Sequence, residues 1–240
     1  MRQLIPLCIP LMLTACGSSN EQSQPVPDPT PPPATAPVDI SIVFNEGAGT
    51  WSAGFSDYPI TDADIYELVA QLAPLPSDNS MQGFRLKGSN RSDDLFMFLK
   101  TEVTELQPST RYQLSGSLTF LSNAGVGCVG IGGAPGESVF VKVGASEIEP
   151  AQVDYYLNVD KGNQSEPGND ALMVGDVAAS EADCSGNVFA EKTIEIELEN
   201  GFEVQTSQSG SIWIFVGTDS GYEGVADLYY TSIDLSLSPV

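Results

Sequence analysis

Oxygen-bearing side chains are spaced along two glycine-containing loops of this 240-residue chain. The candidates are Asp160, Asn163 and Asp170 in the first loop, and Asp219 and Glu223 in the second. Carboxylate and amide oxygens suit a hard cation such as calcium, which takes about six to eight oxygen ligands. The EF-hand pattern is absent, because Lys161 interrupts it. The loops predict either a structural calcium site or polar turns with Asx hydrogen bonds, and both interpretations stay open.

Aromatic side chains in loop-like sequence are the second group that could do chemistry. Trp51, Tyr58 and Tyr222 each lie among Gly, Ser, Asp or Pro residues. A flat ring stacks on the C–H face of a sugar while nearby polar groups bind its hydroxyls. We therefore expect these three residues to form a ligand-binding surface, with packing in the core or at a sheet edge as the alternative for each.

Catalytic groups are less well defined. The chain has no histidine, which excludes Ser-His-Asp, Cys-His and His-zinc chemistry. The 32 acidic residues offer many carboxylate pairs, but no spacing singles out a pair for glycoside hydrolysis. The glycine-rich segment 125–138 lacks the Gly-Lys-Ser/Thr of a phosphate-binding loop and lies between strand patterns. The sequence thus predicts no catalytic residue.

The N-terminus carries a signal for export. Arg2 precedes the apolar run 4–13, and the small residues Thr14 and Ala15 lead to Cys16. This order is typical of a secretory signal peptide, and the apolar run is too short to span a bilayer. An ordinary signal peptide that happens to contain a cysteine is the alternative.

The segment Leu13-Thr14-Ala15-Cys16 resembles the lipobox of bacterial lipoproteins. The resemblance implies cleavage before Cys16, a diacylglyceryl thioether on its sulfur, and fatty acylation, as with palmitate, of the new amino terminus. Gly17, rather than Asp, follows the cysteine. By resemblance to sorting in two-membrane bacteria, this implies a lipid-anchored protein of the cell envelope at the outer membrane.

Charge limits the partners of the exported chain. Nine Lys and Arg residues stand against 32 Asp and Glu residues, for a net charge of −23. This charge repels phosphate backbones and anionic lipid, so we expect no nucleic-acid partner and membrane contact only through the lipid. Of the four cysteines, Cys128 and Cys184 remain once Cys8 is removed and Cys16 is lipidated. In an exported protein they predict a disulfide, with two free thiols as the alternative.

The composition divides the chain into three parts. Residues 1–15 form the signal peptide, and residues 16–37 form a polar, then proline-rich linker with no means of building a core. Residues 38–240 contain alternating strand patterns separated by Gly, Asn, Asp, Ser and Pro. The predicted strands cover residues 39–44, 65–72, 84–87, 94–100, 111–121, 138–143, 153–159, 171–177, 192–199, 202–206, 211–217 and 227–237. The segment 65–72 also fits a helix, and residues 51–59 read as irregular.

These patterns predict an all-β sandwich of roughly ten antiparallel strands. The stretch Leu106-Gln107-Pro108-Ser109-Thr110-Arg111-Tyr112 resembles the tyrosine corner of fibronectin-like and carbohydrate-binding sandwiches. The opening strand and the closing strand resemble those of the galactose-binding-like jelly roll, the fold of many carbohydrate-binding modules. That resemblance implies a jelly roll, with Asp39, Glu46 or Asp234 as further calcium candidates. The chain also resembles bacterial lipoproteins of this build, a resemblance that supplies no activity.

Three functions are consistent with the sequence. The first is a non-catalytic binding module for a glycan or another extracellular polymer. The second is a structural or interaction lipoprotein that docks another envelope protein, and the third, least favoured, is a glycosidase-like enzyme. Aromatic residues beside polar groups in a concave site would favour the first, a broad apolar patch the second, and two convergent acids with perturbed pKa values the third.

Overall fold

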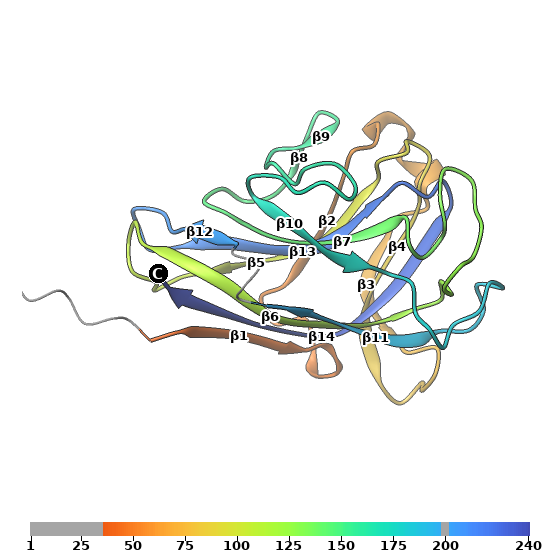
Figure 1. Cartoon of the computed structure of the whole chain (residues 1–240), viewed down its shortest axis with the longest axis horizontal. Coiled ribbons are helices and arrows are strands. Elements are labelled where there is room, and N and C mark those ends of the chain that lie inside the picture. The colour runs from red at the N-terminus through yellow and green to blue at the C-terminus, as the bar shows by residue number, and fades with distance from the viewer. Residues whose placement is uncertain (1–35, 198–201) are drawn as a thin grey trace, which may run out of the picture. The chain divides into compact units, whose positions relative to one another are not determined.

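Two antiparallel sheets pack face to face in the computed structural model, which describes residues 36–197 and 202–240 (Figure 1). The larger sheet has the order β11 (Ala190–Ile196), β6 (Arg111–Ser122), β14 (Val225–Pro239), β4 (Gln82–Ser89) and β3 (Val69–Pro74), with β1 (Val38–Val43) on β14 and β12 (Glu203–Gln205) on β6. The smaller sheet has the order β10 (Ala171–Asp176), β7 (Val139–Ser146), β13 (Ile212–Ser220), β5 (Phe96–Val103) and β2 (Ser52–Ser56). The predicted all-β sandwich is confirmed.

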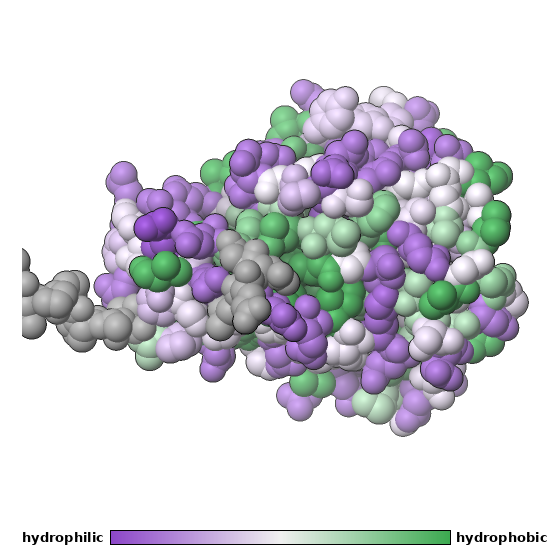
Figure 2. Space-filling model, viewed as in Figure 1, coloured by the Kyte–Doolittle hydropathy of each residue, from purple (hydrophilic) through white to green (hydrophobic). Residues whose placement is uncertain are grey.

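The core lies between the sheets because apolar residues alternate along the strands. Leu118 and Phe120 on β6 and Ile212 and Ile214 on β13 are almost completely buried. Trp213, between the two isoleucines, points to the outer face and is only half-buried, as period-2 geometry requires. Outward positions of the larger sheet are mostly Ser, Thr, Asp and Gln, and Figure 2 shows many hydrophilic residues on the visible face of the molecule.

The tyrosine corner forms as the sequence predicts. Tyr112 is buried at the start of β6, and its hydroxyl oxygen accepts a hydrogen bond of 3.1 Å from the backbone N–H of Gln107. The bond joins the loop before β6 to the strand itself. Within the described residues, no helix has the length and hydropathy needed to cross a bilayer.

Three predictions of secondary structure need correction. Residues 51–59 contain β2, which the abundance of turn residues concealed. Residues 65–72 divide into the end of the 3-10 helix η2 (Ile60–Tyr66) and the start of β3, which ends at Pro74. Residues 153–159 form no long strand, because only β8 (Gln152–Val153) and β9 (Tyr156–Leu157) pair there, as a small hairpin. Part of the predicted strand 192–199, together with residues 1–35, lies outside the described residues.

Strand β14 spans the length of the sandwich, so its pairing partners show which elements lie at each end. Its first residue, Val225, pairs with Ser89, whereas Leu237 pairs with Val38, the first residue of β1. At about 3.3 Å per residue, the strand runs for roughly 40 Å between these points. The start of β1 therefore lies at one end, and the β6–β7, β10–β11 and β13–β14 loops gather at the other (Figure 1).

Candidate functional site

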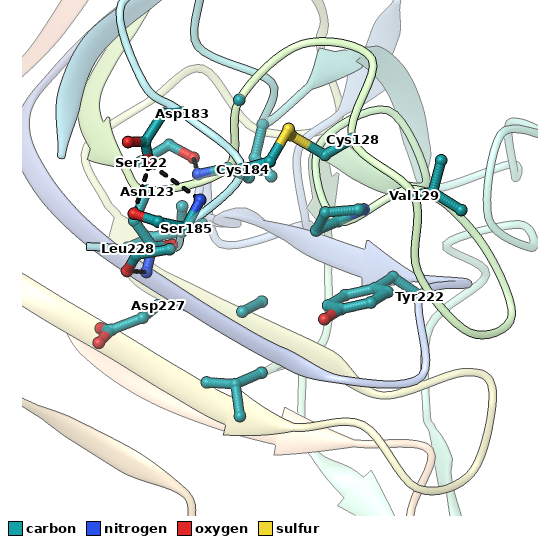
Figure 3. A pocket seen from close by; sticks show the side chains of 17 residues that line it. Ser122, Asn123, Cys128, Val129, Asp183, Cys184, Ser185, Tyr222, Asp227 and Leu228 are labelled. Atoms are coloured by element: carbon teal, nitrogen blue, oxygen red, sulfur yellow. Dashed lines mark hydrogen bonds between the residues drawn. A yellow bond between two sulfur atoms is a disulfide. The ribbon is translucent and has the colours of Figure 1, made fainter. Parts of the chain in front are cut away.

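A cavity of about 190 Å³ opens among the three loops at that end (Figure 3). Its floor is formed by the ends of β6 and β14, and its walls by the β6–β7, β10–β11 and β13–β14 loops. The lining residues are Ser122, Asn123, Ala124, Gly125, Cys128, Val129, Pro135, Val177, Asp183, Cys184, Ser185, Gly186, Tyr222, Val225, Ala226, Asp227 and Leu228. The cavity combines one aromatic ring with several polar side chains.

A disulfide fixes two of the walls. Cys128 in the β6–β7 loop and Cys184 in the β10–β11 loop are bonded, with their Cα atoms 5.5 Å apart. This confirms the predicted pairing. Because the bond closes a separation of 56 residues, it restricts the unfolded chain and holds both loops beside the cavity.

The polar side of the cavity is formed by Asp183, Ser185 and Asn123 (Figure 3). The Asp183 carboxylate accepts hydrogen bonds from the Ser185 hydroxyl at 2.6 Å and from the Ser185 backbone N–H at 2.9 Å. These bonds lower the pKa of Asp183, so this carboxylate is ionised at neutral pH. The Asn123 amide donates to the Gly186 carbonyl at 2.8 Å, which orients its side chain toward the same wall.

Tyr222 faces these polar groups from the opposite side (Figure 3). Its ring is half-buried and lies against two glycines, Gly130 and Gly224. A Cβ at either glycine would approach the ring to 2.4 or 2.2 Å. The Asn90 side chain donates to the backbone carbonyl of Tyr222 at 3.0 Å. Of the residues around this cavity, Tyr222 was a candidate from the sequence, whereas Asp183, Ser185 and Asn123 were not, because turn-forming residues of these types are common in the described loops.

Asp227 contributes a second carboxylate to the lining, but its charge is balanced. Arg85 on β4 donates to both of its oxygens, at 2.8 and 2.6 Å, and also lies over the Tyr229 ring. The fork geometry of the guanidinium suits this bidentate contact. Two carboxylates line the cavity. Asp227 is paired with Arg85, whereas Asp183 has no ion pair among the described residues.

The other two aromatic candidates lie elsewhere. Trp51 is only 6% exposed and packs in the core, so its prediction as a ligand-surface residue is wrong. Its side chain turns inward immediately before β2, where apolar area is removed from water. Tyr58 is half-buried against Tyr66, with ring centroids 5.2 Å apart, and does not line the cavity.

The first calcium candidates form a hydrogen-bonded turn. The Asp160 carboxylate accepts from the Gly162 N–H at 3.1 Å and from the Asn169 N–H at 3.0 Å, and these bonds lower its pKa. Asp170 in turn accepts from the Asp160 N–H at 2.7 Å. Asn163 is exposed and takes part in a turn through its carbonyl, which accepts from Glu166. Of the two interpretations of this loop, the polar turn with Asx hydrogen bonds is the one that the structure shows at Asp160.

The two calcium candidates of the second loop do not lie in one site. Asp219 is fully buried and Glu223 is exposed in the next loop. In residues 36–197 and 202–240, no three acidic or cysteine side chains converge as a metal site. The carboxylate of Asp219 instead binds the ammonium of Lys161 at 2.8 Å.

Lys161 is the centre of a buried charge cluster that the sequence did not reveal. Its ammonium also lies 3.7 Å from Asp57 and 3.5 Å from Asp94, and the cluster borders a second concavity that includes the exposed Tyr156. Desolvation raises the pKa of Asp94 to about 7; Lys161 opposes the rise, and the neighbouring Asp219 and Asp57 add to it. Desolvation raises the pKa of Asp57 as well.

A further buried lysine holds the loop that contains Lys161, through hydrogen bonds to its backbone. Lys142 on β7 is fully buried and donates to the backbone carbonyls of Lys161 and Glu166, at 3.0 and 2.5 Å. Its burial lowers its pKa. The carboxylates and ammonium groups of this cluster are therefore engaged in fastening the 154–170 loop to the smaller sheet. We assign them a structural role, and the cavity beside the disulfide is the better candidate for ligand binding.

In comparisons with known proteins, no protein-family model and no curated protein matches the chain. Solved structures with a similar sandwich include TmCBM61 in complex with β-1,4-galactotriose, with 12% identity, a TM-score of 0.36, and coverage of 82% of this chain and 94% of that chain. The K1 cleaved adhesin domain of Lys-gingipain from Porphyromonas gingivalis W83 has 14% identity, a TM-score of 0.36, and coverage of 84% and 98%. TmCBM27, a carbohydrate-binding module that recognises mannan, has 10% identity, a TM-score of 0.37, and coverage of 86% and 99%. These likenesses concern the β-sandwich architecture, and no binding residue is transferred from them.

Proposed function

We propose that this protein is a non-catalytic glycan-binding protein whose binding site is the cavity beside the Cys128–Cys184 disulfide. The observation that carries the proposal is the placement of the Tyr222 ring opposite Asp183, Ser185 and Asn123. Sugars present an apolar C–H face and a rim of hydroxyls, which match a ring on one side and hydrogen-bonding groups on the other. The mix of aromatic and polar groups in this concave site favours binding. Acids with raised pKa values do converge elsewhere, at Asp57 and Asp94, but both are ion-paired with Lys161 in the charge cluster that holds the 154–170 loop, so we do not assign them to catalysis.

The test is a glycan-array screen of the purified protein, followed by titration calorimetry with any glycan that binds. We expect the Tyr222→Ala variant to lose at least tenfold in affinity, because it removes the stacking surface. Tyr222→Phe, which retains the ring, should keep most of the affinity. Circular dichroism would establish that both variants are folded. A folded wild-type protein that binds no glycan on the array would contradict the proposal.

Docking of an envelope protein is the second candidate function. Val126, Val129 and Ile131 in the β6–β7 loop expose 62%, 95% and 72% of their surfaces beside the cavity. Exposed aliphatic groups grouped in this way are a feature of protein contacts. Replacing Val126 and Ile131 with Ser should leave glycan binding intact, since neither residue lines the cavity. If the same changes abolish glycan binding, this loop has to be included in the site.

We further propose that the protein is anchored through lipid on Cys16 at the outer membrane. Several acyl chains, at about 0.8 kcal/mol for each buried methylene group, make such anchoring stable. Because β1 begins at the end of the sandwich opposite the cavity, a tether at its start would leave the cavity accessible. Mass spectrometry of the mature protein should find the acyl groups on Cys16, and Cys16→Ser should release the protein from membranes. A membrane-bound, unmodified Cys16→Ser variant would contradict lipid anchoring.

A further inference from the structure

We infer that the cavity beside the disulfide binds a single uncharged sugar unit at the end of a glycan and discriminates against uronic, sulfated and phosphorylated units. This inference rests on the proposed function and specifies its ligand class. It follows from three properties of the lining: the sign of its charge, the hydrogen-bonding character of its charged group, and its volume.

The charge of the lining is negative. Asp183 and Asp227 line the cavity, and none of the lining residues is Lys or Arg. Asp227 is already paired with Arg85, whereas Asp183 is held in its ionised form by the bonds from Ser185. An anionic sugar would have to lie within a few ångströms of the Asp183 carboxylate with no cation of the lining beside it. The net charge of −23 adds repulsion at longer range.

Hydrogen-bonding chemistry points the same way. An ionised carboxylate only accepts hydrogen bonds, and both bonds from Ser185 go to Oδ1 of the exposed Asp183, so its Oδ2 can accept a further bond from the ligand. A sugar hydroxyl supplies that donor, and a bond to a charged group is stronger than one between neutral groups. The carboxylate of a uronic acid, a sulfate or an ionised phosphate offers acceptors in its place. A neutral sugar can therefore donate to Asp183 Oδ2, whereas an anionic group at the same place cannot and is repelled by the carboxylate.

The volume limits the number of sugar units. The cavity holds about 190 Å³, whereas pockets for larger organic ligands have volumes from about 300 Å³ upward. Loops close it on three sides, with Tyr222 on one wall and the disulfide on another (Figure 3). We take a cavity of this volume to hold one sugar ring, so the rest of a chain must leave through the opening. We therefore assign the site to a terminal unit.

The test uses matched pairs of oligosaccharides that differ only at the terminal unit: galactose against galacturonic acid, glucose against glucuronic acid, and mannose against mannuronic acid. The purified protein should bind at least one neutral member tenfold or more tightly than its acidic partner. Extending that neutral oligosaccharide from two units to six should change the affinity by less than about threefold.

Two variants isolate the cause. Asp183→Asn keeps the shape of the side chain but removes its charge, and should reduce the preference for the neutral member about fivefold or more, as one unit charge at contact distance implies. Asp39→Asn makes the same change in charge on exposed β1, at the other end of the sandwich, and should leave the preference unchanged.

The outcomes separate the two proposals. If no member of any pair binds and the wider array is also blank, the proposed function is wrong. If acidic members bind as tightly as neutral ones, or if Asp183→Asn and Asp39→Asn have equal effects, glycan binding stands and the inferred ligand class is wrong. An affinity that rises steadily with chain length would overturn the assignment to a terminal unit.

Discussion

The ammonium group of Lys161 joins carboxylates from three separate parts of the chain. Asp57 follows β2, Asp94 precedes β5, and Asp219 lies near the end of β13. Asp57, Asp219 and Lys161 are each at most 5% exposed. Buried charges of this kind are tolerated only while they compensate one another, since each has lost most of its hydration.

Removing the positive charge should therefore be costly. We expect Lys161→Met to lower the free energy of unfolding by about 3 to 5 kcal/mol, because the carboxylates would remain buried without a cation. Lys87→Met is the matched control: Lys87 pairs with the exposed Glu67, and such surface pairs are worth about 1 kcal/mol or less. Urea denaturation at neutral pH measures both. Equal effects would show that the cluster is not energetically coupled.

Asp94 should give the cluster a characteristic pH dependence. Its pKa is about 7 in the folded protein, against an ordinary value of 3.8. Between these values the folded protein retains a proton that the unfolded chain releases, so stability contributed by Asp94 is lost as pH rises from about 4 to 7. The stability of wild type relative to Asp94→Asn should fall across this interval and stay constant above it. Urea titrations at several pH values test this, and a flat difference would contradict it.

At the residue scale, the sequence predicted some contacts and missed others for a physical reason. The Tyr112 corner and the Cys128–Cys184 bond were predictable, because each depends on a local motif or on a small count of one residue type. The partners of Lys161 lie far from it in sequence, so no spacing marks them. The loop that contains Asp160 and Asp170 consequently suggested a calcium site, as did Asp219. The cation that Asp219 binds is instead the ammonium group of Lys161, which lies in that loop.

At the element scale, the loops of the candidate site depend on a covalent bond and on close packing at glycine. The disulfide joins the β6–β7 and β10–β11 loops, which together carry most of the cavity wall. Replacing Cys128 and Cys184 with Ser should lower the free energy of unfolding by about 2 to 4 kcal/mol. Glycan affinity should fall as well, because both walls become mobile. A double variant with unchanged affinity would show that the loops are ordered without the bond.

Gly130 tests whether the position of the Tyr222 ring matters. A Cβ at residue 130 would come within 2.4 Å of that ring and 2.7 Å of the Gly133 carbonyl oxygen, so Gly130→Ala must shift the ring or the loop that packs on it. We expect at least a tenfold loss of glycan affinity, and thermal denaturation would show whether the variant remains folded. Ile131→Ala alters the neighbouring, exposed residue and should leave affinity unchanged. Titration calorimetry compares the two variants, and equal affinities would contradict the assigned role of the ring.

The elements themselves were predicted well where alternation is long. The patterns of β6, β13 and β14 extend over many residues, and each of these strands forms. Strand β2 was missed because small residues, Ser, Ala and Gly, make up four of its five positions, and its pairing with β5 was not visible in the sequence. The opposite error occurred at 153–159. Aromatic residues suggested a strand there, but the chain forms a small hairpin whose two strands have two residues each.

At the scale of the whole molecule, the sandwich places the start of β1 and the cavity at opposite ends, which would separate the proposed attachment from the proposed binding site. The chain enters the domain at the start of β1 and reaches the cavity end along strands that run for roughly 40 Å. A lipid on Cys16 and a proline-rich linker would leave the cavity free to reach an extracellular polymer. The fold class was readable from periodicity, whereas the gathering of the three loops required the topology.

The most direct test of the proposed binding site is the mapping of amide chemical shifts of the isotopically labelled protein during titration with a glycan that it binds. We predict that the shifted resonances cluster in residues 122–125, 128–129, 183–186, 222 and 225–228, which line the cavity. These shift changes should be absent when the same glycan is added to the Tyr222→Ala variant. Shifts concentrated around Tyr156 and Lys161, with the cavity resonances unchanged, would contradict the central claim and transfer the binding site to the charge cluster.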